Sequence, residues 1–392
     1  MPLPSGAARA LTEEVAAAVQ LHEGAEGVAQ VLRRLGSSGK APLKEVARAV
    51  HLPVPVLAAV RRELEARHAL VRGGGLSLSS YGLELLEQLG GPWTPTACPV
   101  CKGAGVVIPE RYEGVLQVLT RLWRDRPEVD VTLDQSFVLP ESNLRRTLFA
   151  LDRGALLGKR VLFLGDDDAG SLAVALLARE LDASVEVCAL DIDRRVNKYL
   201  RSAAEQEGLD VRLVAHDARS PLPGDLRGAF DTVFTDPPYT LPGLELFVSR
   251  ALGAMDGVPG ANVFLSFGRR PPVEAVRALE ALSRMGLALV ELRPGFNRYE
   301  GASVLAGVSD LYHLVATPGA APTVVGEQTE AIYTGELRPR SREYTCRECG
   351  AAYMVGRGRE HETIEALKAA GCARCGAHTF GQGRRRPVGG EG

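Results

Sequence analysis

From Lys159 onward the chain alternates short apolar runs with amphipathic segments, and this pattern restricts the possible folds more than any other feature. The apolar runs are rich in Val, Leu and Phe and are typical of buried strands, whereas the segments between them carry apolar residues at helical spacing. Strands are expected at 159–165, 184–191, 210–217, 230–236 and 261–267. Helices are expected at 169–182, 194–208, 241–255 and 271–286. Continuously apolar strands that are joined by helices predict a parallel sheet with helices on both faces.

Two further apolar runs, 287–296 and 309–318, have no helix between them, so we expect an antiparallel pair at the end of the sheet. This order predicts an α/β fold with a Rossmann-like sheet of the class I methyltransferase type. We place this expected catalytic domain at residues 159–320, after a connector at 91–158 and before a C-terminal extension at 321–392.

Residues 1–90 show three short helical patterns followed by RGGGLSLSSYG, which predicts a winged helix-turn-helix domain. Such modules often bind DNA, but the candidate recognition helix mixes Glu63 and Glu65 with Arg61, Arg62 and Arg67. A helix that reads a groove usually has a cleaner basic and polar face. We therefore expect no specific nucleic-acid binding, and leave dimerisation and a substrate-lid role open for this domain.

The formal net charge of −2 excludes a polycation that holds nucleic acid nonspecifically. No apolar run reaches the roughly 18 residues of a membrane span, and the first residues do not resemble a signal peptide, so a cytoplasmic location without membrane contact is expected. Arginine dominates lysine while Asn, Gln and Met are few, a composition that suits a thermophile. The chain is expected to form a homodimer.

Acidic residues follow successive predicted strands. Asp191 closes the second strand in CALDID, the position of a carboxylate that binds ribose hydroxyls, and Asp217 closes the third in VAHDA, near an expected adenine amino group. One such acid is more often a helix cap, but several together indicate a nucleoside site. The candidate nucleoside-binding residues are Gly165, Asp191, Asp193, Asp217 and Ala218.

The fourth strand ends in FTDPPYT, with Asp236, Pro237, Pro238 and Tyr239 in the turn. The turn resembles that of transferases that act on amine nitrogens, where a carboxylate or amide holds the attacking nitrogen near the donor carbon. Two prolines could equally form a rigid turn without a function. Its position after a buried strand favours the functional interpretation.

Three aspartates, Asp166, Asp167 and Asp168, occupy the turn after the first strand, where a methyltransferase usually has glycines. In a methyltransferase this turn approaches the methionyl part of the donor, whose carboxylate these aspartates would repel. Decarboxylated S-adenosylmethionine lacks that carboxylate and carries an ammonium as well as a sulfonium. The acidic turn therefore indicates the decarboxylated donor as co-substrate, with a polyamine as acceptor.

Taken together, GDDD at 165–168, ALDID, FTDPPYT and the upstream pair Asp134 and Gln135 resemble the branched-chain polyamine synthase family, the N4-bis(aminopropyl)spermidine synthases. The resemblance covers about residues 24–318. It implies transfer of aminopropyl groups from decarboxylated S-adenosylmethionine to the N4 amine of spermidine. The products would be N4-aminopropylspermidine, N4-bis(aminopropyl)spermidine and methylthioadenosine.

Carried over by this resemblance, Asp166 is the expected base and Asp236 the second choice. The residues expected to bind the amine substrate are Asp134, Gln135, Asp167, Asp168, Pro237, Pro238 and Tyr239.

Six of the seven cysteines form three CxxC pairs, which in a reducing compartment indicate metal ligands. The last two pairs have a spacing close to that of a zinc ribbon and predict a small lobe with a structural zinc, or iron, on Cys346, Cys349, Cys372 and Cys375. For Cys98 and Cys101, a bound metal and a simple thiol pair both stay open. Arg357, Arg359 and the GRRRP stretch leave contact with nucleic acid or an acidic protein as an alternative role for this tail.

Two other functions fit parts of the pattern. The DPPY turn, the expected winged helix and the ribbon would suit an S-adenosylmethionine-dependent amino-methyltransferase that acts on RNA or DNA. A winged-helix DNA-binding regulator without catalysis is the third possibility.

Overall fold

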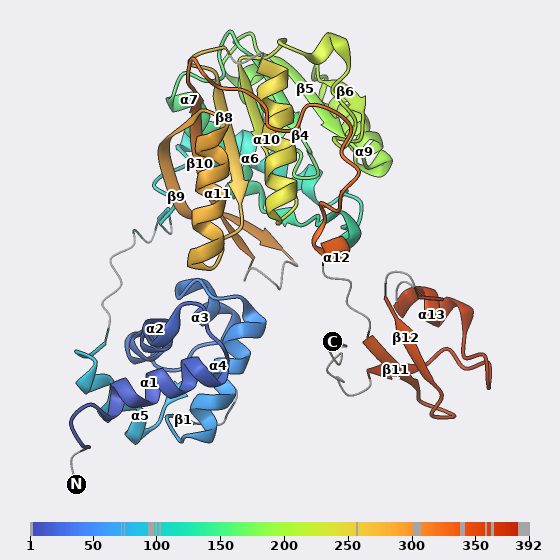
Figure 1. Ribbon diagram of the computed structural model, residues 1–392. Coiled ribbons are helices and arrows are strands. Elements are labelled where there is room, and N and C mark those ends of the chain that lie inside the picture. Colours follow the sequence, from blue (N-terminus) through green and yellow to red (C-terminus); the bar gives the residue numbers. More distant parts are fainter. Residues whose placement is uncertain are drawn as a thin grey trace.

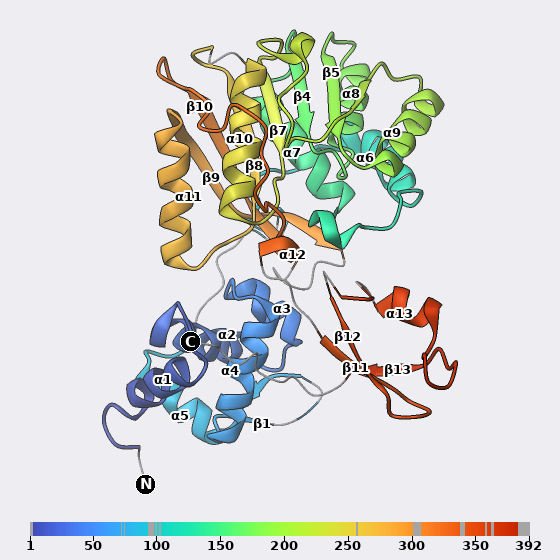
Figure 2. The same cartoon turned by 45° about the vertical axis from the view of Figure 1, so that its right-hand side comes forward.

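The computed structural model describes residues 3–71, 73, 75–92, 98, 100–101, 103–255, 258–300, 307–337, 342–356, 359–361 and 364–382. Figures 1 and 2 show three parts in chain order: an N-terminal helical part, a large central α/β part and a small C-terminal sheet. None of the described helices is both long and apolar enough to cross a membrane.

The central part contains an eight-stranded sheet in the order β3-β9-β10-β8-β7-β4-β5-β6. Five neighbouring strands are parallel, as predicted: β4 (Arg160–Leu164), β5 (Glu186–Asp191), β6 (Arg212–Ala215), β7 (Thr232–Thr235) and β8 (Asn262–Phe267). The expected antiparallel pair is also present, as β9 (Leu287–Glu300) and β10 (Val308–Ala316). Because β10 also pairs antiparallel with β8, this pair extends the parallel strands into a mixed sheet.

Helices cover both faces of this sheet, and each face has its own apolar core. One core includes residues of α6 (Glu113–Trp123), α7 (Pro140–Asp152), α8 (Gly170–Glu180) and α9 (Arg194–Glu207). The other includes residues of α10 (Leu241–Met255) and α11 (Pro272–Arg284). Helix α8 is apolar almost all round and is buried from Gly170 to Ala178, because it lies between the sheet and the α6–α7 layer. Three short 3-10 turns lie at Glu110–Tyr112, Val131–Leu133 and Gly224–Leu226.

The eighth strand, β3 (Phe137–Val138), was not predicted. It pairs antiparallel with the end of β9, through Glu300 and Tyr299. A strand of two residues has no apolar run of its own, so its pairing depends on the fold around it.

The N-terminal part has a separate apolar core. Its elements are α1 (Ala7–Ala18), α2 (Gly24–Ser38), α3 (Leu43–Ala49), α4 (Val54–Ala66), β1 (Leu70–Val71), β2 (Ser77–Leu78) and α5 (Ser80–Gln88). Strands β1 and β2 form an antiparallel hairpin. On the candidate recognition helix, Arg67 pairs with Glu63 at 2.5 Å and Arg61 pairs with Glu65 at 3.6 Å.

After β10, residues 321–337 cross the central part instead of leaving it; we call this segment the strap. Arg250 fixes it through hydrogen bonds of 3.0 Å to the carbonyl of Val324 and 2.7 Å to that of Gly326. Its last turn is α12 (Thr334–Leu337), and Ile332 and Tyr333 are buried in the core beside α10. The strap therefore packs on the α/β part, although sequence analysis assigned it to the C-terminal extension.

The small C-terminal sheet has the order β12-β11-β13. Its elements are β11 (Arg342–Cys346), β12 (Ala352–Val355), α13 (Ile364–Ala370) and β13 (Phe380–Gln382). Of the arginines noted in this tail, Arg359 is described, whereas Arg357 and the GRRRP stretch lie outside the described residues.

Candidate active site

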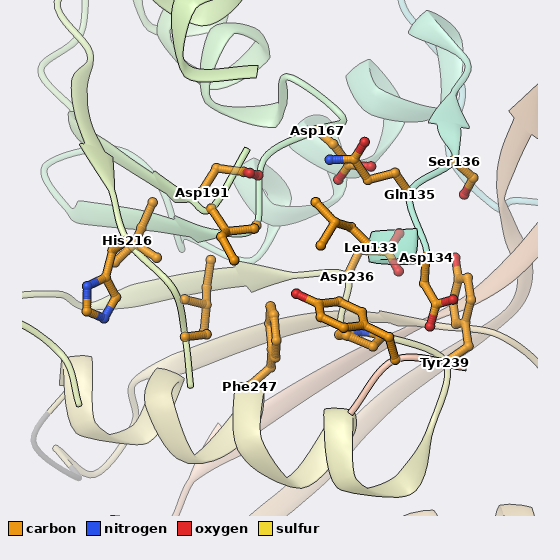
Figure 3. Close-up of a pocket in the computed structure, with 17 residues that line it drawn as sticks. Leu133, Asp134, Gln135, Ser136, Asp167, Asp191, His216, Asp236, Tyr239 and Phe247 are labelled. Atoms are coloured by element: carbon orange, nitrogen blue, oxygen red, sulfur yellow. The ribbon is translucent and has the colours of Figure 1, made fainter. Parts of the chain in front are cut away.

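A cavity of about 610 Å³, counting its open mouth, lies at the carboxyl ends of the parallel strands (Figure 3). The residues that follow β4, β5, β6 and β7 form its floor, and residues 133–136 of the connector and Tyr333 of the strap add further walls. Carboxyl ends of parallel strands are the usual place for ligands in such sheets. Of the predicted site residues, those that line the cavity are Asp134, Gln135, Gly165, Asp167, Asp191, Ala218, Asp236, Pro238 and Tyr239.

The three aspartates of the acidic turn have three different environments. The carboxyl group of Asp166 is buried and faces the start of α8, where it accepts hydrogen bonds from the Gly170 amide at 2.6 Å and the Ser171 hydroxyl at 2.5 Å. Burial raises the pKa of Asp166 to about 8, although these hydrogen bonds act in the opposite direction. Asp166 does not line the cavity.

Asp168 is also engaged within the protein. One of its oxygens accepts the Val138 amide at 3.2 Å, and the other pairs with the buried guanidinium of Arg146 at 3.2 Å. Asp167, by contrast, lines the cavity, and its carboxylate accepts no hydrogen bond from any residue that the structure describes. Burial, together with the charges of Asp168, Asp191 and Asp236, raises the pKa of Asp167 well above its ordinary value. Only one of the three aspartates therefore offers its carboxyl group directly to a ligand.

Asp236, in the turn after β7, lines the same cavity as Asp167. Its Oδ2 accepts a hydrogen bond of 2.5 Å from the Tyr299 hydroxyl, while its Oδ1 is buried and has no partner among the described residues. Burial and the charge of Asp168 raise the pKa of Asp236 to about 7, which Tyr299 and Arg146 partly offset. A carboxyl group with a free oxygen and a pKa near neutrality is suited to accept a proton from a ligand.

Asp191 closes β5 and also lines the cavity. Its two oxygens accept the backbone amides of Asp166 at 2.8 Å and Asp193 at 2.7 Å, so the side chain is held in one orientation. Burial raises the pKa of Asp191 to about 6.

The other predicted nucleoside ligands take local structural roles. Asp193 caps α9 by accepting the Arg195 amide at 2.8 Å, and Asp217 accepts the Arg219 amide at 2.9 Å. Neither of them lines the cavity, and Pro237 does not line it either.

The connector supplies Asp134 and Gln135. Asp134 has a positive φ of 56° and accepts the amide of Thr334, in the strap, at 2.8 Å. Gln135 accepts the Asp130 amide at 2.8 Å and donates to Asp193 at 3.3 Å. The upstream pair is therefore brought beside the acidic turn by contacts with both the strap and the β5 loop.

Three larger side chains that line the cavity were not predicted: His216, Phe247 and Tyr333. His216 directly precedes the predicted Asp217, so its neighbour provided a signal. Tyr333 had no such signal, because its place depends on Glu336, which accepts its amide at 3.2 Å and pairs with Arg219 at 2.7 Å.

The four C-terminal cysteines converge as predicted. Their sulfur atoms all lie within 4.8 Å of one another, with 3.6 Å between Cys346 and Cys375 and 3.5 Å between Cys349 and Cys372. Four thiolates at about 2.3 Å from a tetrahedral metal lie roughly 3.8 Å apart, so this cluster fits a structural zinc ion.

The first cysteine pair is different. Cys98 is exposed, whereas Cys101 is buried and its sulfur accepts the Gly105 amide at 3.3 Å. Among the residues that the structure describes, no third candidate ligand joins these two cysteines.

Residues 114–348 match the model of a protein family described as the branched-chain polyamine synthase A C-terminal domain. The chain is also 36% identical over 297 residues to the N(4)-bis(aminopropyl)spermidine synthase of Thermus thermophilus, which covers 74% of this chain and 81% of that protein. An uncharacterized protein of Methanocaldococcus jannaschii is 36% identical over 374 residues, or 94% of this chain and 92% of that protein.

A solved structure is similar over most of the chain. It is the branched-chain polyamine synthase of Thermus thermophilus in complex with N4-aminopropylspermidine and 5′-methylthioadenosine. The likeness has a TM-score of 0.71 at 29% sequence identity, and it covers 85% of this chain and 99% of that chain. The similarity therefore extends far beyond the acidic turn.

Proposed function

The chain belongs to the branched-chain polyamine synthase family, and from that premise we propose that it is an aminopropyltransferase. It transfers aminopropyl groups from decarboxylated S-adenosylmethionine to the N4 secondary amine of spermidine and releases methylthioadenosine. The observation that carries this proposal is the cavity itself, in which four carboxyl groups, of Asp134, Asp167, Asp191 and Asp236, converge at the strand ends. Both substrates are cations, and a partly desolvated acidic cavity attracts cations strongly.

The donor fits the part of the cavity that follows β4 to β6. Asp191 is held in one orientation and suits the ribose hydroxyls, while Ala218 and His216 lie beside it for the nucleoside. The unpaired carboxylate of Asp167 suits the terminal ammonium of a decarboxylated donor. An intact donor would place its own carboxylate in the same acidic surroundings, which costs free energy.

The acceptor fits the part of the cavity near the turn after β7. For the base we now favour Asp236 over Asp166, because Oδ1 of Asp236 is unpartnered whereas the carboxyl group of Asp166 is directed into α8. The Tyr299 hydroxyl keeps Asp236 in place.

The reaction is then an in-line displacement. The N4 ammonium of spermidine loses a proton to Asp236, and the freed lone pair forms a C–N bond with the aminopropyl carbon beside the sulfonium. The C–S bond breaks, its electrons stay on sulfur, and neutral methylthioadenosine leaves. Since sulfonium is already a good leaving group, the enzyme contributes mainly a free lone pair and alignment. The first product is a tertiary ammonium, which must lose its remaining N–H proton before a second transfer can occur. That second transfer would produce a quaternary ammonium.

The other parts of the chain have proposed roles as well. The four-cysteine cluster holds one structural zinc that folds the C-terminal lobe, and it takes no part in the transfer. The N-terminal part is a winged-helix domain that does not bind specific DNA, since two arginines of the candidate recognition helix are paired with glutamates. A cytoplasmic homodimer is the proposed state.

Mass spectrometry of the products tests the proposed function. Purified protein with spermidine and decarboxylated S-adenosylmethionine should yield N4-aminopropylspermidine and methylthioadenosine. Intact S-adenosylmethionine, offered with the same acceptor, should yield no methylated amine. Methyl transfer from the intact donor, or no aminopropyl product at all, would contradict the proposal.

A further inference from the structure

Arg126 is the most unusual charged residue outside the cavity described above. All three of its guanidinium nitrogens are buried, and none of them has a hydrogen-bond partner among the described residues. Buried polar groups are nearly always satisfied, so three unsatisfied donors on one side chain require an explanation.

The guanidinium lies in a box of aromatic rings. Its central carbon is 4.1 Å from the centre of the Phe137 ring and 4.9 Å from that of Trp123. The two rings pack edge to face, with 6.5 Å between their centres. Trp123 is fixed by a hydrogen bond of 2.9 Å from its indole N–H to the Val138 carbonyl. Arg126 is therefore held by cation–π contacts in place of hydrogen bonds.

This aromatic box borders a second, smaller cavity of about 250 Å³, counting its mouth, which Arg126 lines together with Trp123, Val138, Asp168 and Tyr199. The two cavities are lined by neighbouring residues of the same two segments, 136–138 and 167–168. Ser136 and Asp167 line the larger cavity, whereas their close neighbours in sequence, Val138 and Asp168, line the smaller one. Phe137 lies between Ser136 and Val138, at the boundary between the two cavities.

Acidic side chains lie near the box. Burial lowers the pKa of Arg126, and Asp168, Tyr199, Asp167 and Glu300 act in the opposite direction. Aromatic faces beside carboxylates are the surroundings that an alkylammonium group prefers. The box thus has the chemistry of a polyamine subsite, but a side chain of the protein fills it.

We propose that Arg126 is a specificity-determining residue, which occupies an ammonium-binding box next to the acceptor site and thereby limits the length of the polyamine arm that the enzyme accepts. This inference rests on the proposed function, because it presumes a polyamine in the larger cavity. A longer tetraamine such as spermine has one more aminopropyl unit on one arm, and its terminal ammonium competes with the guanidinium for the same rings.

The test compares spermidine with spermine as acceptors for the wild-type protein, Arg126→Ala and Arg126→Lys. Arg126→Ala empties the box, so the ratio of kcat/KM for spermine to that for spermidine should rise about tenfold, mainly through a lower KM for spermine. Arg126→Lys keeps a cation between the rings and should leave the ratio close to that of the wild type. The matched control is Arg124→Ala, which removes an exposed arginine two residues away and should not change the ratio.

An unchanged ratio in an active Arg126→Ala protein would overturn the proposal, and so would an equal rise in Arg124→Ala, since the effect would then be one of overall charge. If Arg126→Ala is inactive with both acceptors, Arg126→Met, which keeps the apolar stem, is measured in its place. If Arg126→Met also fails to turn over spermidine, a role limited to arm length is refuted. Calorimetric binding of spermine to the wild type and to Arg126→Ala separates this inference from the proposed function. Tighter spermine binding by the variant supports the box even if the wild-type protein transfers no aminopropyl group.

Discussion

Replacing Asp236 and Asp166 by asparagine, one at a time, should affect two different properties of the protein. Asp236→Asn keeps an oxygen that can accept the Tyr299 hydroxyl, and it places an amide where Oδ1 had no partner. The free energy of unfolding should therefore change little. The substitution removes the proposed base, so turnover at neutral pH should fall by about 100-fold or more.

Asp166→Asn should show the opposite pattern. The carboxyl group of Asp166 uses both oxygens, because one accepts the Gly170 amide and the other the Ser171 hydroxyl. An asparagine has only one acceptor oxygen, and its NH₂ group would face donors at the start of α8. We expect a loss of about 1 kcal/mol in the free energy of unfolding, with turnover of the folded protein close to that of the wild type.

The assay measures the rate of methylthioadenosine release with saturating spermidine between about pH 6 and about pH 9. This range spans the pKa of about 7 at Asp236. Chemical unfolding of each variant measures its stability. The wild-type rate should rise as Asp236 loses its proton and then level off. In Asp236→Asn the rate should continue to rise under alkaline conditions, because only the solution ionisation of the acceptor then supplies free lone pairs.

The opposite result, in which Asp166→Asn loses turnover and Asp236→Asn does not, would refute this reasoning. If Asp166→Asn loses turnover without losing stability while Asp236→Asn keeps its rate, the base is Asp166, as the family resemblance alone suggested. If both variants keep their rates, neither carboxyl group is the base, and Asp167 becomes the next candidate to replace.

Three further predictions concern the rest of the molecule. Without substrates, stability should fall as the pH rises from about 5 to 7, because Asp191 and Asp236, with pKa values of about 6 and 7, keep protons in the folded state that the unfolded chain, with ordinary values of 3.8, has already released; a melting temperature that is flat or rises over this range would contradict those pKa values. Elemental analysis should find about one metal ion per chain, and this metal should disappear, with turnover retained, when serine replaces Cys346, Cys349, Cys372 and Cys375. Duplex DNA at physiological salt should give no footprint at nanomolar protein, and a clear footprint would favour the regulator interpretation.

The central fold was predictable because its signals are local. Strands β4 to β8 are apolar runs long enough to be read from neighbouring residues, and the helices between them keep a regular period. Strand β3 has two residues and no such run. It pairs with Tyr299 and Glu300, which lie far along the chain, so no local signal predicts it. Position after a buried strand was likewise sufficient to find Asp191 and Asp236.

The directions in which individual side chains point could not be predicted from the sequence. The sequence predicts that three adjacent aspartates form an acidic turn. It does not predict that Asp166 faces a helix, Asp168 an arginine and Asp167 the cavity. These directions depend on residues such as Arg146 and Ser171, which show no special pattern. Arg126 is a similar case, since one arginine among many gives no sign that it will lie between two aromatic rings.

The strap has a consequence for how the protein is made. A nascent chain that ends at residue 320 already contains all eight strands of the central sheet, but it lacks Tyr333 and the amide that Asp134 accepts. Ribosomal synthesis therefore completes the hydrophobic framework first and the substrate cavity afterwards. A premature stop or a proteolytic cut between the end of β10 and residue 337 would leave a domain that contains every described strand of its sheet but has an incomplete wall around its cavity.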